Sequence, residues 1–219
     1  METRIIAACD FEKEAIAAVN VIKNGEAIIF PTETVYGIGV DGFNETACRK
    51  LYELKRRPLD KPVTEHIADM AGFYAVAGEI NDMTKKLAAA FMPGPITLIV
   101  KKSCRVPTVI TGGSDTVGVR MPDNLTAQML IKAAGVPLAA SSANIAGKEP
   151  PATAEKSLSY YAGSVPFVID GGKTLYEQSS TVVDCTGIEP KIIRNGAITE
   201  SMILAVLAGT TERSDGNER

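Results

Sequence analysis

The stretch Phe30-Pro31-Thr32-Glu33-Thr34-Val35-Tyr36-Gly37 is the most informative part of the sequence. It follows the apolar run 27–29 and places two threonines, a glutamate and a tyrosine between a proline and a glycine. A strand that runs into such a polar loop is typical of a ligand-binding segment. The stretch therefore predicts a small-molecule site at the end of a strand.

The bulk properties of the chain predict one compact domain. Its 219 residues are 45% hydrophobic and 22% charged, which is enough apolar material for a sizeable core. We assign residues 1–209 to this domain and expect the polar residues 210–219 to form a flexible tail. The formal net charge of -3 gives no overall attraction to nucleic acid, which binds through Lys and Arg.

The sequence does not indicate a targeting or membrane segment. The first residues, Met1-Glu2-Thr3-Arg4, do not form a signal-peptide pattern, and no apolar run approaches the ~20 residues needed to cross a bilayer. The cysteines at positions 9, 48, 104 and 185 form no CxxC pair, and the chain has one histidine. We therefore expect a cytoplasmic protein with no membrane contact, buried reduced thiols and no metal site of its own.

Helical and strand patterns alternate along the chain. Apolar spacing predicts a helix between Asp10 and Gly25, followed by a strand over residues 26–30. Asn44 is placed to cap a second helix, which ends in Lys55-Arg56-Arg57 before Pro58. Further helices are expected at 69–77, 82–91, 125–134, 154–161 and 200–208, and further strands at 96–100, 116–120, 136–140, 165–169, 181–184 and 191–194. This mixture predicts an α/β domain, whose strand order one sequence does not reveal.

Two segments resemble phosphate-binding motifs but do not satisfy them. Residues 37–42 fit the pattern GxGxxG, yet the loop 31–36 separates them from the preceding strand, and the next helix starts only after the last glycine. Gly172-Lys173-Thr174 resembles the end of a P-loop, but Phe167 occupies the position of its leading glycine. We interpret the second segment as a turn between strands.

Covalent catalysis has little support in the sequence. Ser141 and Ser142 are not part of a GxSxG turn, and His66 is the only imidazole that could act as their base. The chain instead carries cations and hydroxyls near the ends of its expected strands: Thr32, Lys55, Arg57, Thr116, Arg120, Ser142, Asn144, Ser180 and Arg194. These side chains suit an anionic ligand that is held by many hydrogen bonds.

Six blocks of the sequence, in the family order, resemble the YrdC-like family. They are residues 30–37, Lys55-Arg56-Arg57-Pro58 with Pro62 and His66, Pro93-Gly94-Pro95-Ile96-Thr97, Val117-Gly118-Val119-Arg120-Met121-Pro122, Ala140-Ser141-Ser142-Ala143-Asn144 and Ser180-Thr181-Val182-Val183-Asp184. The resemblance covers most of the chain and is far more specific than any single motif.

The resemblance implies a fold and a reaction. Members of this family are threonylcarbamoyl-AMP synthases, which combine L-threonine, bicarbonate and ATP into threonylcarbamoyladenylate and pyrophosphate, for threonylcarbamoyladenosine in tRNA. The implied fold is a twisted mixed α/β sheet, flanked by helices, around a positively lined cavity. The implied partners are a downstream threonylcarbamoyl-transferase and a weak contact with tRNA, and Mg²⁺ is expected to enter with the ATP phosphates.

The resemblance also implies roles for individual residues. Lys55 and Arg57 are the expected catalytic groups, because they would bind the ATP phosphates. The threonine pocket is expected to contain Thr32, His66, Arg120 and Ser180, and the nucleotide side Thr116, Ser142, Asn144 and Arg194. Arg120 is the expected clamp for the amino acid's carboxylate, although Glu33 is an alternative partner for it.

Other interpretations stay open at this stage. The cations of residues 55–57 could act only as favourable charges at a helix C-terminus, and the family's usual asparagine and apolar pair are replaced by Lys61 and by Thr64-Glu65. The chain ends soon after the family domain, so we expect its site to close without the extra domain of longer relatives. Alternative functions are an RNA-binding or ribosome-assembly module, and a carbamoyl-adenylate-forming domain of hydrogenase maturation.

Overall fold

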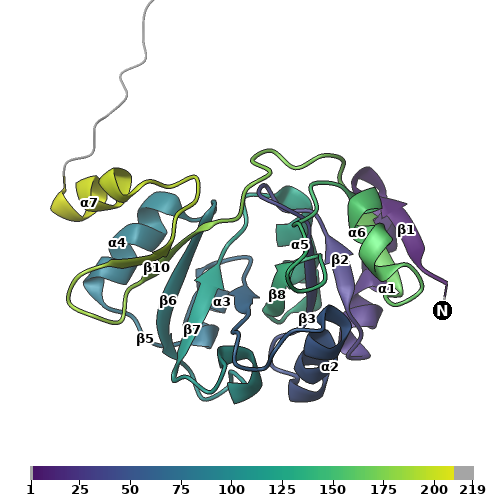
Figure 1. Ribbon diagram of the computed structural model, residues 1–219, viewed down its shortest axis with the longest axis horizontal. Helices are drawn as coiled ribbons and strands as arrows, with labels where there is room; N and C mark the ends of the chain where they lie inside the picture. The colour runs from purple at the N-terminus through teal and green to yellow at the C-terminus, as the bar shows by residue number, and fades with distance from the viewer. Residues whose placement is uncertain (1, 210–219) are drawn as a thin grey trace, which may run out of the picture.

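The computed structural model describes residues 2–209, which form an α/β fold around one mixed sheet (Figure 1). The helices are α1 (Phe11–Lys23), α2 (Glu45–Lys55), α3 (Met70–Val76), α4 (Asp82–Phe91), α5 (Leu125–Ala134), α6 (Ala154–Tyr161) and α7 (Glu200–Ala208), with short 3-10 helices η1 (Ala8–Asp10) and η2 (Thr108–Thr111). The strands are β1 (Arg4–Ala7), β2 (Ile28–Phe30), β3 (Gly37–Asp41), β4 (Thr64–His66), β5 (Ala77–Glu79), β6 (Ile96–Lys102), β7 (Thr116–Arg120), β8 (Leu138–Ser142), β9 (Phe167–Asp170), β10 (Thr181–Asp184) and β11 (Lys191–Arg194).

The strands of the sheet combine parallel and antiparallel pairs. Their order is β1-β9-β2-β3-β8-β4-β7-β6-β10-β11, and β5 pairs with β6 beside this path. For example, β7 is parallel to β4 but antiparallel to β6. The connection from β9 to β10 crosses the top of the molecule in Figure 1 and links its two halves.

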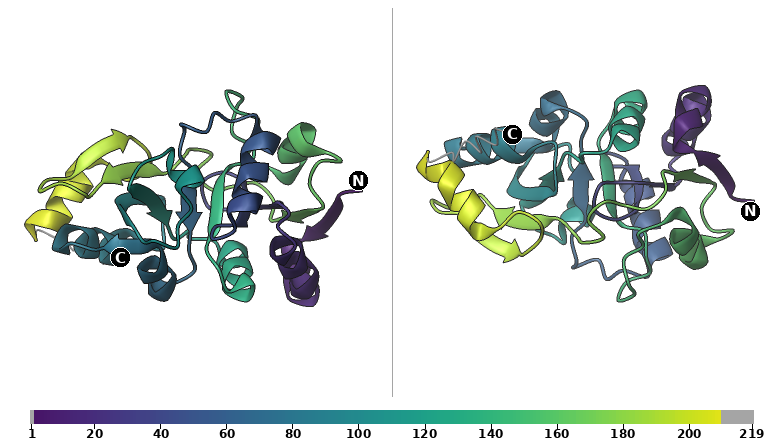
Figure 2. Two further views of the ribbon diagram at one scale, coloured as in Figure 1. Left: turned by 90° about the horizontal axis from the view of Figure 1, so that it is seen from below. Right: turned by 90° about the horizontal axis from the view of Figure 1, so that it is seen from above.

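Helices cover both faces of the sheet, with α1 and α5 on one side and α2 and α6 on the other (Figure 2). Phe11 and Ile22 of α1 pack with Leu130 of α5 in one apolar core. Cys48 and Leu51 of α2 belong to a second core. Helices α1, α2 and α5 therefore each bury an apolar face in these cores, as amphipathic helices do.

Phe30 of β2 lies close to the glycines of β3. Phe30 pairs with Gly37, and a side chain at Gly37 would place its Cβ only 3.1 Å from the Phe30 ring. Glycine therefore lets the aromatic ring lie flat against β3. Residues 37–41 are a strand, so the GxGxxG pattern does not form a phosphate loop here.

Several predicted elements match the structure residue for residue. These are the helices at 82–91, 125–134, 154–161 and 200–208, and the strands at 116–120, 181–184 and 191–194. Strands β1, β3, β4 and β5 are absent from the sequence prediction, and β8 lies two residues later than predicted. The segment 172–174 lies in the connection between two strands, as predicted.

The prediction that the thiols are buried is wrong for two of the four cysteines. Cys48 and Cys185 are buried, whereas Cys9 and Cys104 are exposed, and all four are free. The reason is local: Cys9 lies in the short helix η1, and Cys104 lies in the turn after β6.

Within residues 2–209, the helices are too short or too polar for any of them to cross a bilayer. The expected flexible tail at 210–219 lies outside the described residues.

Candidate functional site

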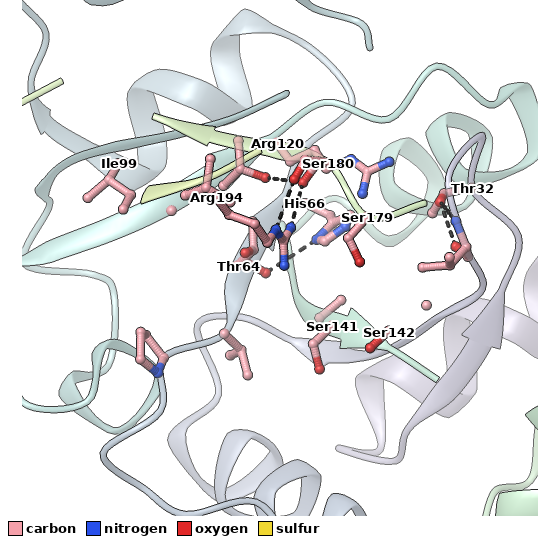
Figure 3. A pocket seen from close by; sticks show the side chains of 18 of the residues that line it. Thr32, Thr64, His66, Ile99, Arg120, Ser141, Ser142, Ser179, Ser180 and Arg194 are labelled. Atoms are coloured by element: carbon pink, nitrogen blue, oxygen red, sulfur yellow. Dashed lines mark hydrogen bonds between the residues drawn. The ribbon is translucent and has the colours of Figure 1, made fainter. Parts of the chain in front are cut away.

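A cavity of about 280 Å³ opens along one face of the sheet (Figure 3). Residues two apart on neighbouring strands face it, namely Thr64 and His66 of β4, Thr97 and Ile99 of β6, and Gly118 and Arg120 of β7. This spacing is the period of two that places alternate strand residues on one face. A side chain at Gly118 would put its Cβ 3.1 Å from Thr97 Cγ2. The glycine therefore leaves room in the cavity beside Thr97.

Three arginines and no carboxylate are among the residues that line this cavity. Arg57 follows α2, Arg120 ends β7 and Arg194 ends β11, so residues far apart in the sequence bring positive charge to one space. Arg57 donates from Nε to Lys61 O at 3.0 Å and from Nη2 to Pro62 O at 2.8 Å. The cavity therefore attracts anions, and Arg57 is held at its edge by backbone carbonyls.

Arg120 is almost completely buried and contacts the loop 31–36. Its Nη2 donates to Thr34 Oγ1 at 2.7 Å and lies 2.8 Å from Glu33 Oε1, in an ion pair whose side chains are only 7% and 4% exposed. The Glu33 contact is a charge contact without hydrogen-bond geometry, and Arg120 Nε has no partner. Glu33, the alternative partner that the sequence analysis named, therefore balances the charge of the Arg120 guanidinium. One donor of the guanidinium, Nε, is left without an acceptor.

His66 is a buried neutral imidazole beside this arginine. Burial, and then the charge of Arg120, lower the pKa of His66 to about 3. Its Nδ1 lies 3.3 Å from Thr64 O, and its ring meets Phe30 edge to face with centroids 6.1 Å apart. Among residues 2–209, no hydrogen bond joins His66 to Ser141 or Ser142, so the arrangement does not resemble a serine hydrolase.

Thr32 lines the cavity and organises the loop that the sequence singles out. Its Oγ1 donates to Val35 O at 2.6 Å, lies 2.9 Å from Thr34 Oγ1 and accepts from the amides of Thr34 and Val35. Hydroxyls that bond to the backbone two or three residues on are typical of tight turns. The hydroxyl therefore fixes the turn that carries Glu33 and Thr34 toward Arg120.

A second polar group joins β6, β10 and β11. Ser180 Oγ lies 2.8 Å from Thr97 Oγ1, and Arg194 donates from Nη2 to Ser180 Oγ and from Nε to Ser180 O, at 3.1 and 3.0 Å. Desolvation and the charge of Arg120 lower the pKa of Arg194. Figure 3 shows Arg120, Ser180, Arg194 and His66 together on one side of the cavity, opposite Ser141 and Ser142 of β8.

Three of the predicted site residues do not line the cavity. Lys55 is buried behind its wall and donates from Nζ to the carbonyls of Ser142 and Asn144. The Asn144 amide donates to Ile145 O and Lys148 O, so it holds its own loop. Thr116 lies on the same face of β7 as Gly118 but beyond the cavity, where its hydroxyl is 2.9 Å from Ser114 Oγ.

The structure adds polar lining residues that sequence reasoning missed. They are Thr64, Thr97, Ser141 and Ser179. Ser141 is the most informative of them, because its hydroxyl is buried without a hydrogen-bond partner. The alternation that places Arg120 on the cavity face would have found Thr97 and Thr64, had the pairing of their strands been known.

The described residues contain no group of three or more His, Cys, Asp or Glu side chains that could hold a metal ion. The acidic residues nearest the cavity wall include Glu33, which is already paired with Arg120. A divalent cation at this site would therefore depend on oxygen atoms of the ligand.

Comparison with known proteins gives consistent matches. The model of the Sua5/YciO/YrdC family, described as telomere recombination, matches residues 20–196. The chain is 43% identical over 181 residues to a threonylcarbamoyl-AMP synthase of Pyrococcus abyssi, covering 83% of this chain and 53% of the relative. It is 39% identical over 191 residues to a threonylcarbamoyl-AMP synthase of Bacillus subtilis, covering 87% of this chain and 55% of the relative.

A solved structure is similar over most of the chain. The crystal structure of P. abyssi Sua5 complexed with L-threonine superimposes with a TM-score of 0.89 at 41% identity, and the match covers 94% of this chain and 61% of that one. The present chain thus spans about half the length of the two curated relatives.

Proposed function

Because the chain belongs to the Sua5/YciO/YrdC family, we propose that it makes L-threonylcarbamoyladenylate and pyrophosphate from L-threonine, bicarbonate and ATP. The observation that carries the proposal is a cavity that three arginines line without a carboxylate. The names of its relatives and the L-threonine bound to P. abyssi Sua5 support the same substrates. In this proposal residues 1–209 act as one functional domain.

The proposed chemistry explains why the cavity needs fixed cations. A carbamate formed from threonine and bicarbonate attacks the α-phosphorus of ATP, and pyrophosphate leaves on the opposite side. The protein must bring two anions together and stabilise the charge that builds on the leaving group. Guanidinium groups suit both tasks, because their planar donors match carboxylate and phosphate oxygens.

The positions of the side chains suggest how the substrates divide the cavity. Arg120, held from behind by Glu33, would bind the threonine carboxylate, with further contacts to threonine from Thr32, His66 and Ser180. The ATP phosphates and nucleoside would contact the groups at the other edges, which are Arg57, Ser142 and Arg194. Lys55, Asn144 and Thr116 would act on ATP from behind or beside the wall.

The proposed reaction also requires a cation with the nucleotide and a protein that consumes the product. Mg²⁺ would enter as part of the substrate, bound to the ATP phosphates. A downstream threonylcarbamoyl-transferase would consume the adenylate, with at most a weak direct contact to tRNA, because the formal net charge is -3. The reaction would take place in the cytoplasm.

Pyrophosphate release tests this proposal directly. Purified protein is incubated with Mg·ATP, and threonine and bicarbonate are each added and each omitted. We expect release only when both are present, because the carbamate is the nucleophile.

An Arg57→Ala variant and an Arg49→Ala control complete the experiment. Arg49 is an exposed arginine on α2 that pairs with Glu45, so its variant should keep wild-type turnover while Arg57→Ala loses most of it. Folded wild-type protein that releases no pyrophosphate under any combination would refute the synthase and favour an RNA-binding module.

A further inference from the structure

Helix α7 is apolar all round its axis. Its residues 202–207, Met-Ile-Leu-Ala-Val-Leu, form an unbroken apolar run, whereas a surface helix usually has polar residues on one side. Only Ile203 of this helix is fully buried, and Met202 and Leu204 remain 43% and 51% exposed. A helix that is apolar all round is typical of a buried position. Within residues 2–209, α7 therefore has an apolar face that is not covered.

A groove of about 660 Å³ lies at this face, where α7 packs beside α4 at one end of the molecule (Figure 1). Ile188, in the turn between β10 and β11, is completely exposed and lines the groove together with Leu204 and Leu207. Met83 of α4 and Pro190 add further apolar surface. Exposed apolar side chains that gather in one place, rather than singly, are typical of a protein-binding surface.

Carboxylates surround the groove. Asp82, Glu189 and Glu200 line it, and Lys86 is the only cation among the described residues that do so. Glu189 and Glu200 are exposed and belong to none of the ion pairs found within residues 2–209, whereas Asp82 pairs with Lys85. The rim of the groove is therefore acidic, and two of its carboxylates have no cation opposite them.

Two occupants that the chain itself could provide do not suit this groove. Residues 210–219 contain two arginines but no Leu, Ile, Val, Met or aromatic residue, so they offer no apolar side chain to fill it. A second copy, placed by two-fold symmetry, would bring the same acidic rim against itself. Like charges that face each other across an interface weaken binding. A different protein of opposite charge avoids both problems.

We propose that the groove between α4 and α7 binds an amphipathic helix of another protein. Apolar side chains of that helix contact Ile188 and Leu204, and its Lys or Arg residues pair with Glu189 and Glu200. The apolar contacts supply most of the affinity, and the charges select the partner. The groove shares no lining residue with the cavity, so the partner and the substrates can be bound at the same time.

Two synthetic peptides serve as probes of this surface. Each has about 18 residues, which is long enough for a helix in water, with Leu at helical spacing on one face. One peptide carries Lys at its remaining positions, and the other carries Glu. Fluorescence anisotropy of the labelled peptides measures their binding to the full-length protein. We expect the Leu/Lys peptide to bind at least about tenfold more tightly than the Leu/Glu peptide.

Apolar substitutions locate the contact. Leu204→Ser and Ile188→Ser should each weaken binding of the Leu/Lys peptide at least about fivefold, because each removes apolar surface that the peptide buries. Leu125→Ser is the matched control, since Leu125 of α5 is 73% exposed and lies outside the groove. It should leave binding unchanged. All three side chains are exposed in the free protein, so the variants should keep the fold.

Charge reversal tests the selection of the partner. The double variant Glu189→Lys/Glu200→Lys should reverse the preference, so that the Leu/Glu peptide binds more tightly than the Leu/Lys peptide. The control is Glu12→Lys/Glu53→Lys, which makes the same change in net charge at exposed positions of α1 and α2. This control should keep the wild-type preference.

The remaining outcomes overturn the proposal. It fails if the Leu/Lys peptide does not bind, if both peptides bind equally, or if the Leu204 and Ile188 variants bind as the wild type does. Sedimentation velocity should show a monomer, and a dimer that Leu204→Ser dissociates would mean that a second copy fills the groove. Tighter peptide binding by Arg213→Ser/Arg219→Ser would mean that residues 210–219 occupy it instead.

Discussion

Arg120 illustrates how one side chain can join two parts of the fold and also line the cavity. Its Nη2 contacts Thr34 and Glu33, while its Nε remains without a partner. An arginine held on one side by a buried carboxylate has a fixed direction and spare donors. Because Arg120 also lines the cavity, a carboxylate that enters there would meet a guanidinium that is already oriented, which would lower the entropy lost on binding.

Replacing this arginine should affect threonine far more than ATP. We expect Arg120→Ala to weaken threonine binding by at least roughly 30-fold, because removing one partner of a buried charge pair typically costs about 2 to 5 kcal/mol. ATP binding should change by less than about threefold, since ATP would rely on Arg57 and Arg194. Separate calorimetric titrations of the two ligands give the comparison.

The control for this variant must separate binding from stability. Arg120→Ala leaves Glu33 buried without its partner, so the variant should also lose free energy of unfolding. The double variant Arg120→Ala/Glu33→Gln removes that unpaired charge and should recover stability but not threonine binding. A larger loss for ATP than for threonine in the double variant would contradict the assignment of Arg120.

At the scale of elements, local signals explain what the sequence could predict. Asn44 accepts a hydrogen bond from an amide in the first turn of α2, as the sequence predicts. Asn81 and Asn124 cap α4 and α5 in the same way, although the sequence analysis placed those two helices without a capping residue. Strands β4 and β5 have three residues each and little β-propensity of their own. They exist because neighbouring strands supply their hydrogen bonds, and a single sequence contains no such information.

The same limit applies to the site. The resemblance in the sequence pointed to Arg57, Arg120 and Arg194, which the fold brings to one cavity. It could not reveal that Lys55 donates to carbonyls of β8 and the following loop, because the contact with Ser142 joins residues 87 positions apart. Nor could it place Thr116 beyond the cavity edge, which depends on how far each strand extends.

Strand β4 carries an unusual buried acid. Thr64 and His66 face the cavity, whereas Glu65 points to the opposite side, is fully buried and has no hydrogen-bond partner at either oxygen. Its carboxylate packs so closely over Gly42 that any side chain there would clash with it. Burial, and then the charge of Asp41, raise the pKa of Glu65 to about 8.

This acid should make stability depend on pH. The folded-state pKa of Glu65 is raised from 4.5 to about 8. The contribution of this residue to the free energy of unfolding is therefore complete below pH 4.5 and is lost as pH rises through 8. Within that window the loss is about 1.4 kcal/mol per pH unit for one proton. Glu65→Gln keeps the shape without the titration, so its free energy of unfolding should exceed that of wild type increasingly from pH 5 to pH 8.

Urea denaturation at each pH measures the difference. Glu53→Gln serves as the control, because Glu53 is exposed on α2 and should give a curve parallel to wild type. A constant difference between wild type and Glu65→Gln across this range would show that Glu65 does not change its protonation between the folded and unfolded states.

At the scale of the whole molecule, the cavity extends over most of the sheet, as far as the edge formed by β11. Strands from β3 to β11 contribute to the cavity wall, so no single half of the molecule contains the site. Cys48 of α2 and Cys185, which follows β10, belong to the same apolar core although they are far apart in the sequence. Opening either thiol to solvent therefore requires that this core be disrupted.

The four cysteines should report this cooperativity. We expect Cys9 and Cys104, which are exposed, to react with a maleimide reagent within the mixing time. Cys48 and Cys185 should react slowly and at equal rates, because both wait for the same opening of the core. Peptide mapping by mass spectrometry after timed pulses follows each thiol separately.

Adding the proposed substrate Mg·ATP separates cooperative opening of the core from local opening. A ligand that binds only the folded state lowers the open population by the factor 1 + [L]/Kd, so Mg·ATP at about 100 times its Kd should slow Cys48 and Cys185 roughly 100-fold together, while Cys9 and Cys104 stay unchanged. If Cys185 instead reacts much faster than Cys48 and ignores ATP, the β10 end opens independently of the rest. Because Ser180 and Arg194 lie at that same end, the cavity would then lose one wall without global unfolding, and the sheet could not be treated as one cooperative unit.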